Sequence, residues 1–418
     1  MLHEPMLLIA LAVGFYMAWN IGANDVANAF GTAVGSGAVN FRLALILAAI
    51  FEFSGAFFVG SSVADTIKGN IVLPSAFEAT PHLFALGMLA ALLAASIWLH
   101  VATFMGKPVS TTHAIIGAVI GFGLVAKGAG AVQWVKLIRI AASWFVSPLV
   151  GGGLAFLVYY AIRRTVLRND DPVRRAKMVV PLGLGSTIGI VLLSIVYQMG
   201  PRFVSGCSAK QLCLMSSPGV VALAVAAGLI ARGIIALRTR DRVHVPHEAY
   251  TTVERWFGRL QIVTACYMSF AHGANDVANA IGPVAAVLQA ARGCVTAKAL
   301  VPSWVLAFGG LGIVAGLAMY GGKVIEAVGK KITEVTPTRG FSAEFGTATT
   351  VLVCSMMGLP ISTTFVLVGA VMGIGFARGF GAIDMSVVKS IFASWVITIP
   401  ISAVLAAVIY KALLVVGL

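Results

Sequence analysis

The chain has 418 residues, of which 59% are hydrophobic and only 11% are charged, and its mean hydropathy is +0.96. Soluble domains carry about 25% charged residues, so this chain has too little polar sequence to cover the surface of a soluble fold. The net charge of +14 does not indicate nucleic-acid binding, because most of the excess lies in two short blocks. Composition therefore predicts a membrane protein whose surroundings are a lipid bilayer, with no nucleic-acid partner.

Long apolar runs occur along the whole chain, and several reach the roughly 20 residues that an α-helix needs to cross a bilayer. They cover residues 7–22, 43–63, 82–104, 179–199, 220–237, 300–320 and 387–416. A transmembrane β-barrel would show alternating segments of about 10 residues, and these are absent. Residues 1–6 lack the basic start of a signal peptide, so we expect the first run to be a retained span. The pattern predicts an all-α polytopic membrane protein.

Two basic blocks flank a pair of central apolar runs. They consist of Arg163, Arg164, Arg168, Arg174, Arg175 and Lys177, and of Arg232, Arg238, Arg240, Arg242, Arg255 and Arg259. Cytoplasmic loops carry an excess of lysine and arginine, so we expect both blocks to lie inside. Two spans between them bring the chain back to the side that it left, which agrees with this placement.

An internal repeat is the most informative feature of the sequence. The octapeptide GANDVANA occurs at residues 22–29 and again at residues 273–280, an offset of 251. GKPVSTT at residues 106–112 matches GLPISTT at residues 358–364, an offset of 252. Collinear matches at almost one offset indicate a duplication. We expect repeat 1 in residues 1–162, basic cytoplasmic segments with two central spans in residues 163–257, and repeat 2 in residues 258–418.

The number of crossings predicts that the two repeats have inverted topology. If the short segment after residue 110 crosses the membrane, repeat 1 has five spans, begins outside and ends inside. The central pair then returns the chain to the inside, so repeat 2 starts there. We expect about 12 transmembrane segments with broken or re-entrant helices, and both termini outside.

The octapeptides place polar side chains inside apolar sequence. Each motif holds one aspartate and two asparagines: Asn24, Asp25 and Asn28, and Asn275, Asp276 and Asn279. The aspartate and the second asparagine are three residues apart and share a helix face, whereas the first asparagine should point elsewhere. The Gly-Ala opening predicts a broken helix that exposes carbonyl groups. A charge at membrane depth costs at least ~2.5 kcal/mol and is functional by default.

Carboxylate, amide and carbonyl oxygens are hard ligands, which suit Na⁺ by extension of the logic for other hard cations. A protonatable aspartate is a second interpretation, and asparagines that hydrogen-bond two helices together are a third. Two identical copies favour a cation site, at which sodium would be the bound metal ion.

The second pair of motifs predicts helix starts, because proline and hydroxyl residues are favoured there. The hydroxyl residues are Ser110, Thr111, Thr112, Ser362, Thr363 and Thr364. A helix N-terminus attracts anions through its free N–H groups and dipole, and two such starts from inverted repeats would converge on one ligand. The alternative is that these hydroxyls only cap a kinked span. Cation sites beside an anion site predict cation-coupled anion symport.

At these residues the chain resembles the inorganic phosphate transporter (PiT) family, in its prokaryotic sodium/phosphate symporter form. The resemblance implies phosphate bound by the two Ser-Thr-Thr segments, sodium bound by the two octapeptides, and no cofactor. It further implies an elevator-like carrier, a homodimer, and, because the central basic segments are short, a prokaryotic inner membrane. Proton-coupled phosphate or metal-phosphate symport, another oxyanion such as sulfate, and a passive anion channel remain alternatives.

Three further residues stand out. Glu52 and Glu344 lie inside apolar stretches where the family carries acidic residues, and each could serve gating, an additional cation or a structural hydrogen bond. His113 follows the first Ser-Thr-Thr segment and is interpreted as a spacer rather than a proton site. Sodium is preferred to protons because a proton-driven carrier would leave Asn28 and Asn279 without a role. An enzyme is not expected, since the sequence has no activated nucleophile–base pair.

Overall fold

The computed structural model describes residues 3–69, 71–105, 109–204, 208–238, 246–293, 295, 301–321, 336–379 and 385–416. Within these ranges the chain forms 13 α-helices and short 3₁₀ or π turns, and the one β-type contact is a bridge between Val72 and Val132. The all-α prediction is therefore confirmed for the described part of the chain.

The helices follow the order of the predicted repeats. The first group is α1 (His3–Gly35), α2 (Phe41–Val59), α3 (Ser61–Gly69), α4 (Pro81–Phe104), α5 (Thr111–Lys127) and α6 (Trp134–Ile162). The central pair is α7 (Pro172–Phe203) and α8 (Ala209–Arg238). The last group is α9 (Pro246–Ala290), α10 (Ser303–Gly316), α12 (Pro337–Met356), α13 (Thr363–Arg378) and α14 (Met385–Val416).

Eight of the described helices are long and apolar enough to cross a membrane. The helices α5 and α13 are apolar but shorter, with 17 and 16 residues. Although α9 has 45 residues and α12 has 20, polar side chains keep both from meeting the same criterion of length and hydropathy. The expected total of about 12 spans and the inverted topology stay predictions.

Helix starts and ends follow local sequence. The Asn40 side chain accepts a hydrogen bond from the Leu43 N–H at 2.9 Å and caps α2, and Asp171 caps α7 in the same way through Arg174. Gly128, at φ +77°, ends α5 in the left-handed region that favours glycine. These caps satisfy backbone donors and acceptors that have no partner inside the helix.

Equivalent helix contacts occur in both halves of the molecule. The helix α1 packs on α10, as α9 packs on α2, and α5 packs on α14, as α13 packs on α6. Glycines allow the backbones to approach closely, as is common between membrane helices. A Cβ added to Gly22 would lie 1.9 Å from the Ile313 carbonyl oxygen, and one added to Gly273 would lie 2.1 Å from that of Glu52. Much of the packing therefore runs between the halves rather than within them.

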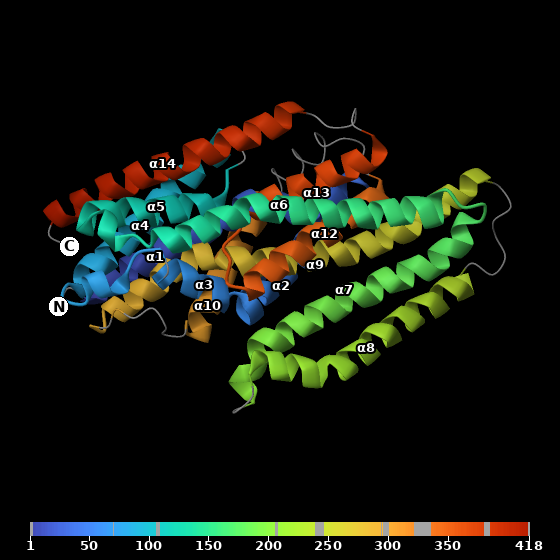
Figure 1. The fold of residues 1–418 in the computed structure, drawn as a ribbon, viewed down its shortest axis with the longest axis horizontal. Coiled ribbons are helices and arrows are strands. Elements are labelled where there is room, and N and C mark those ends of the chain that lie inside the picture. Colours follow the sequence, from blue (N-terminus) through green and yellow to red (C-terminus); the bar gives the residue numbers. More distant parts are fainter. Residues whose placement is uncertain are drawn as a thin grey trace.

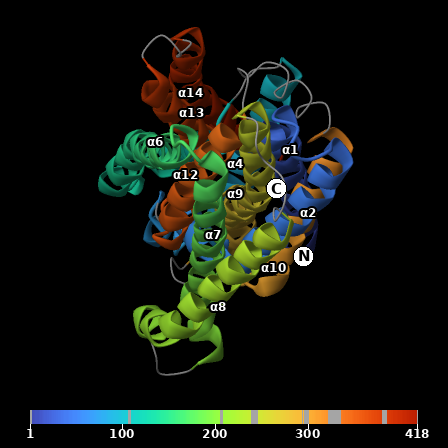
Figure 2. The same ribbon diagram turned by 90° about the vertical axis from the view of Figure 1, so that its right-hand side faces the viewer.

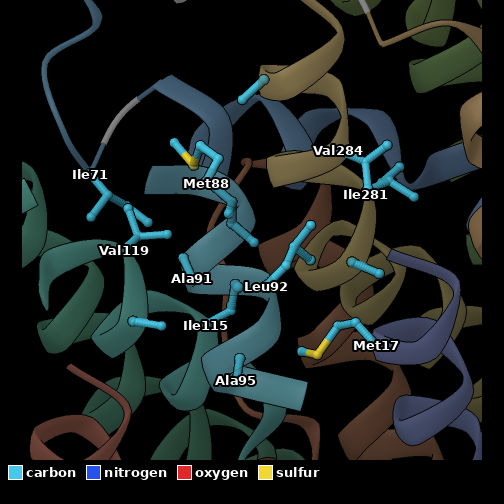
Figure 3. Close-up of a cluster of buried hydrophobic side chains, with 14 of the residues drawn as sticks. Met17, Ile71, Met88, Ala91, Leu92, Ala95, Ile115, Val119, Ile281 and Val284 are labelled. Carbon is cyan, nitrogen blue, oxygen red and sulfur yellow. The ribbon is translucent and has the colours of Figure 1, made fainter. Parts of the chain in front are cut away.

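The largest apolar cluster surrounds α4. Figure 3 shows Met88, Ala91, Leu92 and Ala95 of α4 beside side chains of α5 and α9. Leu92 is fully buried among them. The helix is consequently covered by protein along most of its length.

The pair α7 and α8 lies along one side of the bundle (Figures 1 and 2), and many large apolar side chains of α8 are exposed there. Both termini lie at one end of the long axis, whereas the turn from α6 to α7 and the start of α9 lie at the other end. The turn after α6 and the first part of α9 hold basic residues of the two blocks. The sidedness expected from the sequence stays a prediction.

Candidate functional site

Both GANDVANA motifs lie inside continuous helices. Because α1 runs from His3 to Gly35 and α9 from Pro246 to Ala290, the predicted helix break at Gly-Ala is wrong. The motif glycines instead make room for neighbouring backbone, as the close approach at Gly22 and Gly273 shows. The ligand groups of the motifs are therefore side chains and not unwound carbonyls.

Both Ser-Thr-Thr segments begin a helix, as predicted. Ser110 is the N-cap residue of α5 and accepts a hydrogen bond from the His113 N–H at 3.2 Å, while Ser362 is the N-cap residue of α13. Pro360 lies two residues before its N-cap rather than at the first helical position, and Pro108 lies outside the described residues. Two helix N-termini thus carry their hydroxyl residues into the core.

Each amide–carboxylate motif meets the helix start of the other repeat. The Asn28 amide donates to the Thr364 hydroxyl at 2.8 Å, and the Asn279 amide donates to the Thr112 hydroxyl at 3.2 Å. Asn279 also lies 3.3 Å from the Thr111 hydroxyl. The structure therefore brings the predicted cation and anion residues together in one cluster.

Donors surround both aspartates. Oδ1 of Asp25 accepts from Asn24 at 3.2 Å, Asn28 at 3.0 Å and Thr364 at 3.4 Å. The prediction that Asn24 points away from Asp25 is wrong, because a residue adjacent in sequence can still bend its amide back to the carboxylate. Asn24 is held in place by the Thr103 hydroxyl, which donates to its amide oxygen at 3.1 Å.

The second motif repeats these contacts and adds to them. Oδ1 of Asp276 accepts from Asn279 at 3.0 Å, Asn275 at 3.1 Å and Thr112 at 3.3 Å, and Oδ2 accepts from Thr363 at 3.0 Å. Asn275 also points to its aspartate, against expectation, and Ser355 donates to its amide oxygen at 3.4 Å. The pairs Asn24–Thr103 and Asn275–Ser355 occupy matching places in the two repeats.

One amide oxygen of this cluster has no donor. Oδ1 of Asn279 is buried and has no hydrogen-bond partner among the described residues. Its amide nitrogen is already used by Asp276 and the α5 hydroxyls, which fixes the side chain with the oxygen left over. A buried acceptor without a donor costs free energy unless a ligand satisfies it, and a cation is a ligand of that kind.

His272 is a further residue of this cluster, and it lies outside the motifs found in the sequence. Its Nε2 lies 2.8 Å from Asp276 Oδ2 and 4.0 Å from Asp25 Oδ2, and its Nδ1 lies 3.1 Å from Glu52 Oε1. Each short contact thus joins one ring nitrogen to one carboxyl oxygen, so the imidazole lies between Glu52 and Asp276. The available signal was its spacing, four residues before Asp276 on the same helix.

Asp25, His272 and Asp276 each offer one ligand atom, and these atoms lie within 4.8 Å of one another. All three residues are buried. The chemistry of this group, two carboxylates with one imidazole, suits the binding of a cation in the core.

Glu344 lies in a separate buried cluster. Its carboxylate accepts from the Thr32 hydroxyl at 2.5 Å, the Gln261 amide at 3.0 Å and the Thr264 hydroxyl at 2.6 Å. Thr264 is 12 residues before Asp276 on α9, or about 18 Å along the helix axis. Glu52 joins the central cluster through His272, whereas Glu344 does not take part in it through these partners.

His113 and Trp144 support the α13 start. The His113 ring is buried with its centroid 3.9 Å from that of Trp144 and 5.1 Å from that of Phe365. The Trp144 indole N–H donates to the Pro360 carbonyl at 2.9 Å. These contacts fit the interpretation of His113 as a spacer and of Trp144 as a packing residue, while the Trp395 side chain lies outside the described residues.

Residues 21–406 match the Phosphate transporter family. A relative named as a phosphate permease, from Pyrococcus furiosus, is 46% identical over 415 residues, which cover 99% of this chain and 98% of the relative. The chloroplastic inorganic phosphate transporter 2-1 of Arabidopsis thaliana is 44% identical over 420 residues, covering 95% of this chain and 70% of that protein.

A solved structure described as the sodium-dependent phosphate transporter is 40% identical. It has a TM-score of 0.91 and covers 99% of this chain and 100% of its own. An all-helical fold with apolar spans, a buried core that joins two repeated motifs, and a family match over nearly the whole sequence agree with one another. The chain belongs to the phosphate transporter family and is a multi-pass membrane transporter, not an enzyme.

Proposed function

We propose that this protein imports inorganic phosphate by symport with sodium. The observation that carries the proposal is the contact between motifs of opposite repeats. Asn28 meets Thr364 of α13, and Asn279 meets Thr112 of α5. Ligands suited to a cation thus lie next to helix starts suited to an oxyanion.

Phosphate would bind between the N-termini of α5 and α13. Their N–H groups and hydroxyls can donate to its oxygens, and the helix dipoles favour negative charge. The six hydroxyl residues of this site are Ser110, Thr111, Thr112, Ser362, Thr363 and Thr364.

Sodium would bind at the two aspartates. Asp25 and Asp276 would repel phosphate unless cations lay between the carboxylates and the anion. The unpartnered Oδ1 of Asn279 supplies a neutral oxygen ligand at one of these sites. Cation and anion binding are thereby linked, because each ion reduces the electrostatic cost of holding the other in a low-dielectric core.

The solved relative described as a sodium-dependent phosphate transporter supports sodium as the coupling ion. The alternatives are proton-coupled phosphate or metal-phosphate symport, and transport of another oxyanion such as sulfate. A proton needs only one basic group, which would leave the Asn279 oxygen unsatisfied.

Glu344 would serve an additional cation or gate its path. Its carboxylate is surrounded by the oxygens and amide of Thr32, Gln261 and Thr264, a set that can rearrange around a small cation. Glu52 would have a different role, because it contacts His272 in the central cluster.

The family resemblance supports an elevator-like alternating-access mechanism in a homodimer. It also supports the inner membrane of a prokaryote as the location. The turn after α6 and the start of α9, which hold basic residues of both central blocks, lie at the end of the molecule opposite the termini, and with the positive-inside rule this supports N- and C-termini on the outside.

The test is uptake of radiolabelled phosphate into proteoliposomes, with sodium and pH gradients imposed separately. We expect uphill uptake with a sodium gradient alone. Full uptake in sodium-free buffer with a pH gradient would overturn sodium coupling and favour a proton carrier, while purely downhill flux would indicate a channel. Competition by unlabelled sulfate at equal concentration would overturn the assignment of phosphate as the preferred oxyanion.

A further inference from the structure

The two aspartates of the core differ in the number of close contacts that their carboxylate oxygens make. A carboxylate offers about four lone-pair positions. Asp276 has five close contacts, three to Oδ1 and two to Oδ2, with the longest at 3.3 Å. Asp25 has three, all to Oδ1, and His272 Nε2 lies 4.0 Å from its Oδ2. Of the two aspartates, only Asp25 therefore keeps a carboxylate oxygen that a cation could approach without displacing a donor among the described residues.

The difference comes from one pair of residues that the other repeat lacks. Subtracting the offset of 251 from His272 gives Ile21. Gly22 packs on the Ile313 carbonyl as Gly273 packs on that of Glu52, so Ile313 occupies the place that matches Glu52. An isoleucine pair thus stands on one side of the core where an imidazole–carboxylate pair stands on the other.

Glu52 contacts the imidazole of His272 on the side opposite Asp276. It lies 3.1 Å from Nδ1, and both side chains are fully buried. The two ring nitrogens face two carboxyl groups on opposite sides of the imidazole, with Nε2 2.8 Å from Asp276 and Nδ1 3.1 Å from Glu52. The ring is therefore held between two negative groups, and its Nε2 occupies the approach to Asp276 Oδ2 that a sodium ion would need.

We propose that His272, positioned by Glu52, makes the two sodium sites unequal. The first sodium ion binds tightly at Asp25, and the second binds at Asp276 only when the His272 ring withdraws from Oδ2. At this second site Asn279 Oδ1 has no hydrogen-bond partner among the described residues and could bind sodium directly. Only Asp276 Oδ2, which His272 contacts, has to be freed. This inference rests on the proposed sodium symport and adds to it an order of binding and a positioning role for His272 and Glu52.

The primary test is sodium binding to the purified protein in detergent, measured by equilibrium binding of radioactive sodium. We expect two ions whose dissociation constants differ by about ten- to a hundred-fold, the range for one contact between charged groups. Asp25→Asn should remove the tighter ion, and Asp276→Asn should remove the weaker one. Two ions of equal affinity, or loss of the tighter ion in Asp276→Asn, would overturn the inference.

The matching residues of the other repeat define a second variant. Changing both residues, His272→Ile and Glu52→Ile, copies the Ile21–Ile313 pair, and Asp276 loses its imidazole contact but keeps its four hydrogen-bond donors. We expect the two sodium constants to converge, mainly because the weaker ion binds more tightly. If His272 and Glu52 only support the fold, the double substitution should leave the ratio of the two dissociation constants unchanged or weaken the binding of both sodium ions. His100→Ile, at an exposed position of α4, controls for the loss of an imidazole elsewhere.

The outcomes separate this inference from the proposed function. If the wild-type protein binds no sodium, sodium symport itself fails. If it binds two ions of equal affinity, symport stands and the role of His272 fails. Should the double variant not fold, the two aspartate variants still assign the tighter ion to one motif or the other and so decide the question.

Discussion

The surroundings of Glu344 and Leu92 differ sharply, although the two residues occupy matching positions in the two repeats. Subtracting 252 from Glu344 gives Leu92, and both side chains are fully buried. Glu344 is surrounded by hydrogen-bond donors from α1 and α9. Leu92 lies in the largest apolar cluster (Figure 3), and the positions that match Gln261 and Thr264 are Ala10 and Val13.

The comparison separates what the duplication kept from what changed afterwards. The motifs proposed to bind the ions occur in both halves with matching contacts, as the pairs Asn24–Thr103 and Asn275–Ser355 show. The group of Glu344, Gln261 and Thr264 in repeat 2 is matched by apolar residues in repeat 1. At these positions repeat 1 is apolar, whereas repeat 2 carries polar groups on α9 and α12.

The largest effect on transport is expected from the aspartates of the GANDVANA motif, which is the same in both halves. Either Asp25→Asn or Asp276→Asn should abolish sodium-driven phosphate uptake in proteoliposomes, because each change removes the charge that holds a cation beside the phosphate. The protein should still insert and purify as a folded species. Glu78→Gln, an exposed carboxyl-to-amide change, should leave uptake unchanged. Uphill uptake at a normal rate by Asp25→Asn would show that the cation site lies elsewhere.

The next largest effect is expected at Leu92, the position where the two repeats differ. Leu92→Glu copies Glu344 into the apolar cluster, where Ala10 and Val13 cannot donate hydrogen bonds. A buried charge without partners costs several kcal/mol, so we expect a large loss of folded protein and a lower Tm in a fluorescence melting assay. Leu92→Met, which conserves volume, is the control and should cost less than about 1.5 kcal/mol. A Tm for Leu92→Glu within a degree of the wild type would mean that the cluster admits water.

The sequence predicted the all-α membrane fold and the transporter family, which are confirmed, and it proposed a duplication and a set of site residues, which stay predictions. The apolar runs locate most spans because lipid requires apolar surface on helices that face it. The same rule fails for α9 and α12, which face protein and carry polar groups such as Gln261 and Thr347 on buried surfaces. Hydropathy measures contact with lipid, so it underestimates a membrane helix that other helices cover.

Two features of the site could not be read from the motifs alone. The helix break expected at Gly22 and Gly273 is absent because these glycines admit a neighbouring backbone, and sequence does not distinguish that use from a break. The contact of His272 with Glu52 joins α9 to α2 across a separation of 220 residues. Only the packing of the two repeats brings this pair together.

A third prediction concerns the two helix starts as halves of one anion site. Thr111→Val and Thr363→Val each remove a hydroxyl and keep the shape of the side chain. A lost hydrogen bond to a charged ligand costs roughly 1.5–3 kcal/mol, so the apparent phosphate affinity should fall about ten- to a hundred-fold. Thr363→Val should also change the sodium dependence, because Thr363 donates to Asp276.

Thr80→Val is the matched control for this prediction. Thr80 precedes α4 without a side-chain cap bond, and its hydroxyl has no hydrogen-bond partner among the described residues, so its substitution should be neutral. Unchanged phosphate affinity in both Thr111→Val and Thr363→Val would rule out an anion site formed by both repeats.

A fourth prediction distinguishes two roles for Glu344. Glu344→Gln keeps the shape and removes the charge. If Glu344 binds an additional cation, the half-saturating sodium concentration for phosphate uptake should rise several-fold while phosphate affinity at saturating sodium stays the same. If its contacts with Thr32 and Thr264 are only structural, the Tm falls and the sodium dependence does not change. Glu248→Gln, at an exposed position near the start of α9, is the control.

The smallest effect comes from the amides and bears most directly on sodium. Hydrogen bonds between membrane helices average ~0.6 kcal/mol, so as purely structural groups Asn28 and Asn279 would alter stability slightly and sodium dependence not at all. As ligands they should act on sodium: Asn28→Ala and Asn279→Ala should each raise the half-saturating sodium concentration in the uptake assay. The effect of Asn279→Ala should be the larger of the two, because its buried Oδ1 has no other partner among the described residues.

Asn40→Ala, which removes only the cap of α2, should leave the sodium dependence unchanged. Equal sodium dependence in the wild type and both amide variants would assign the coupling ion to the carboxylates alone.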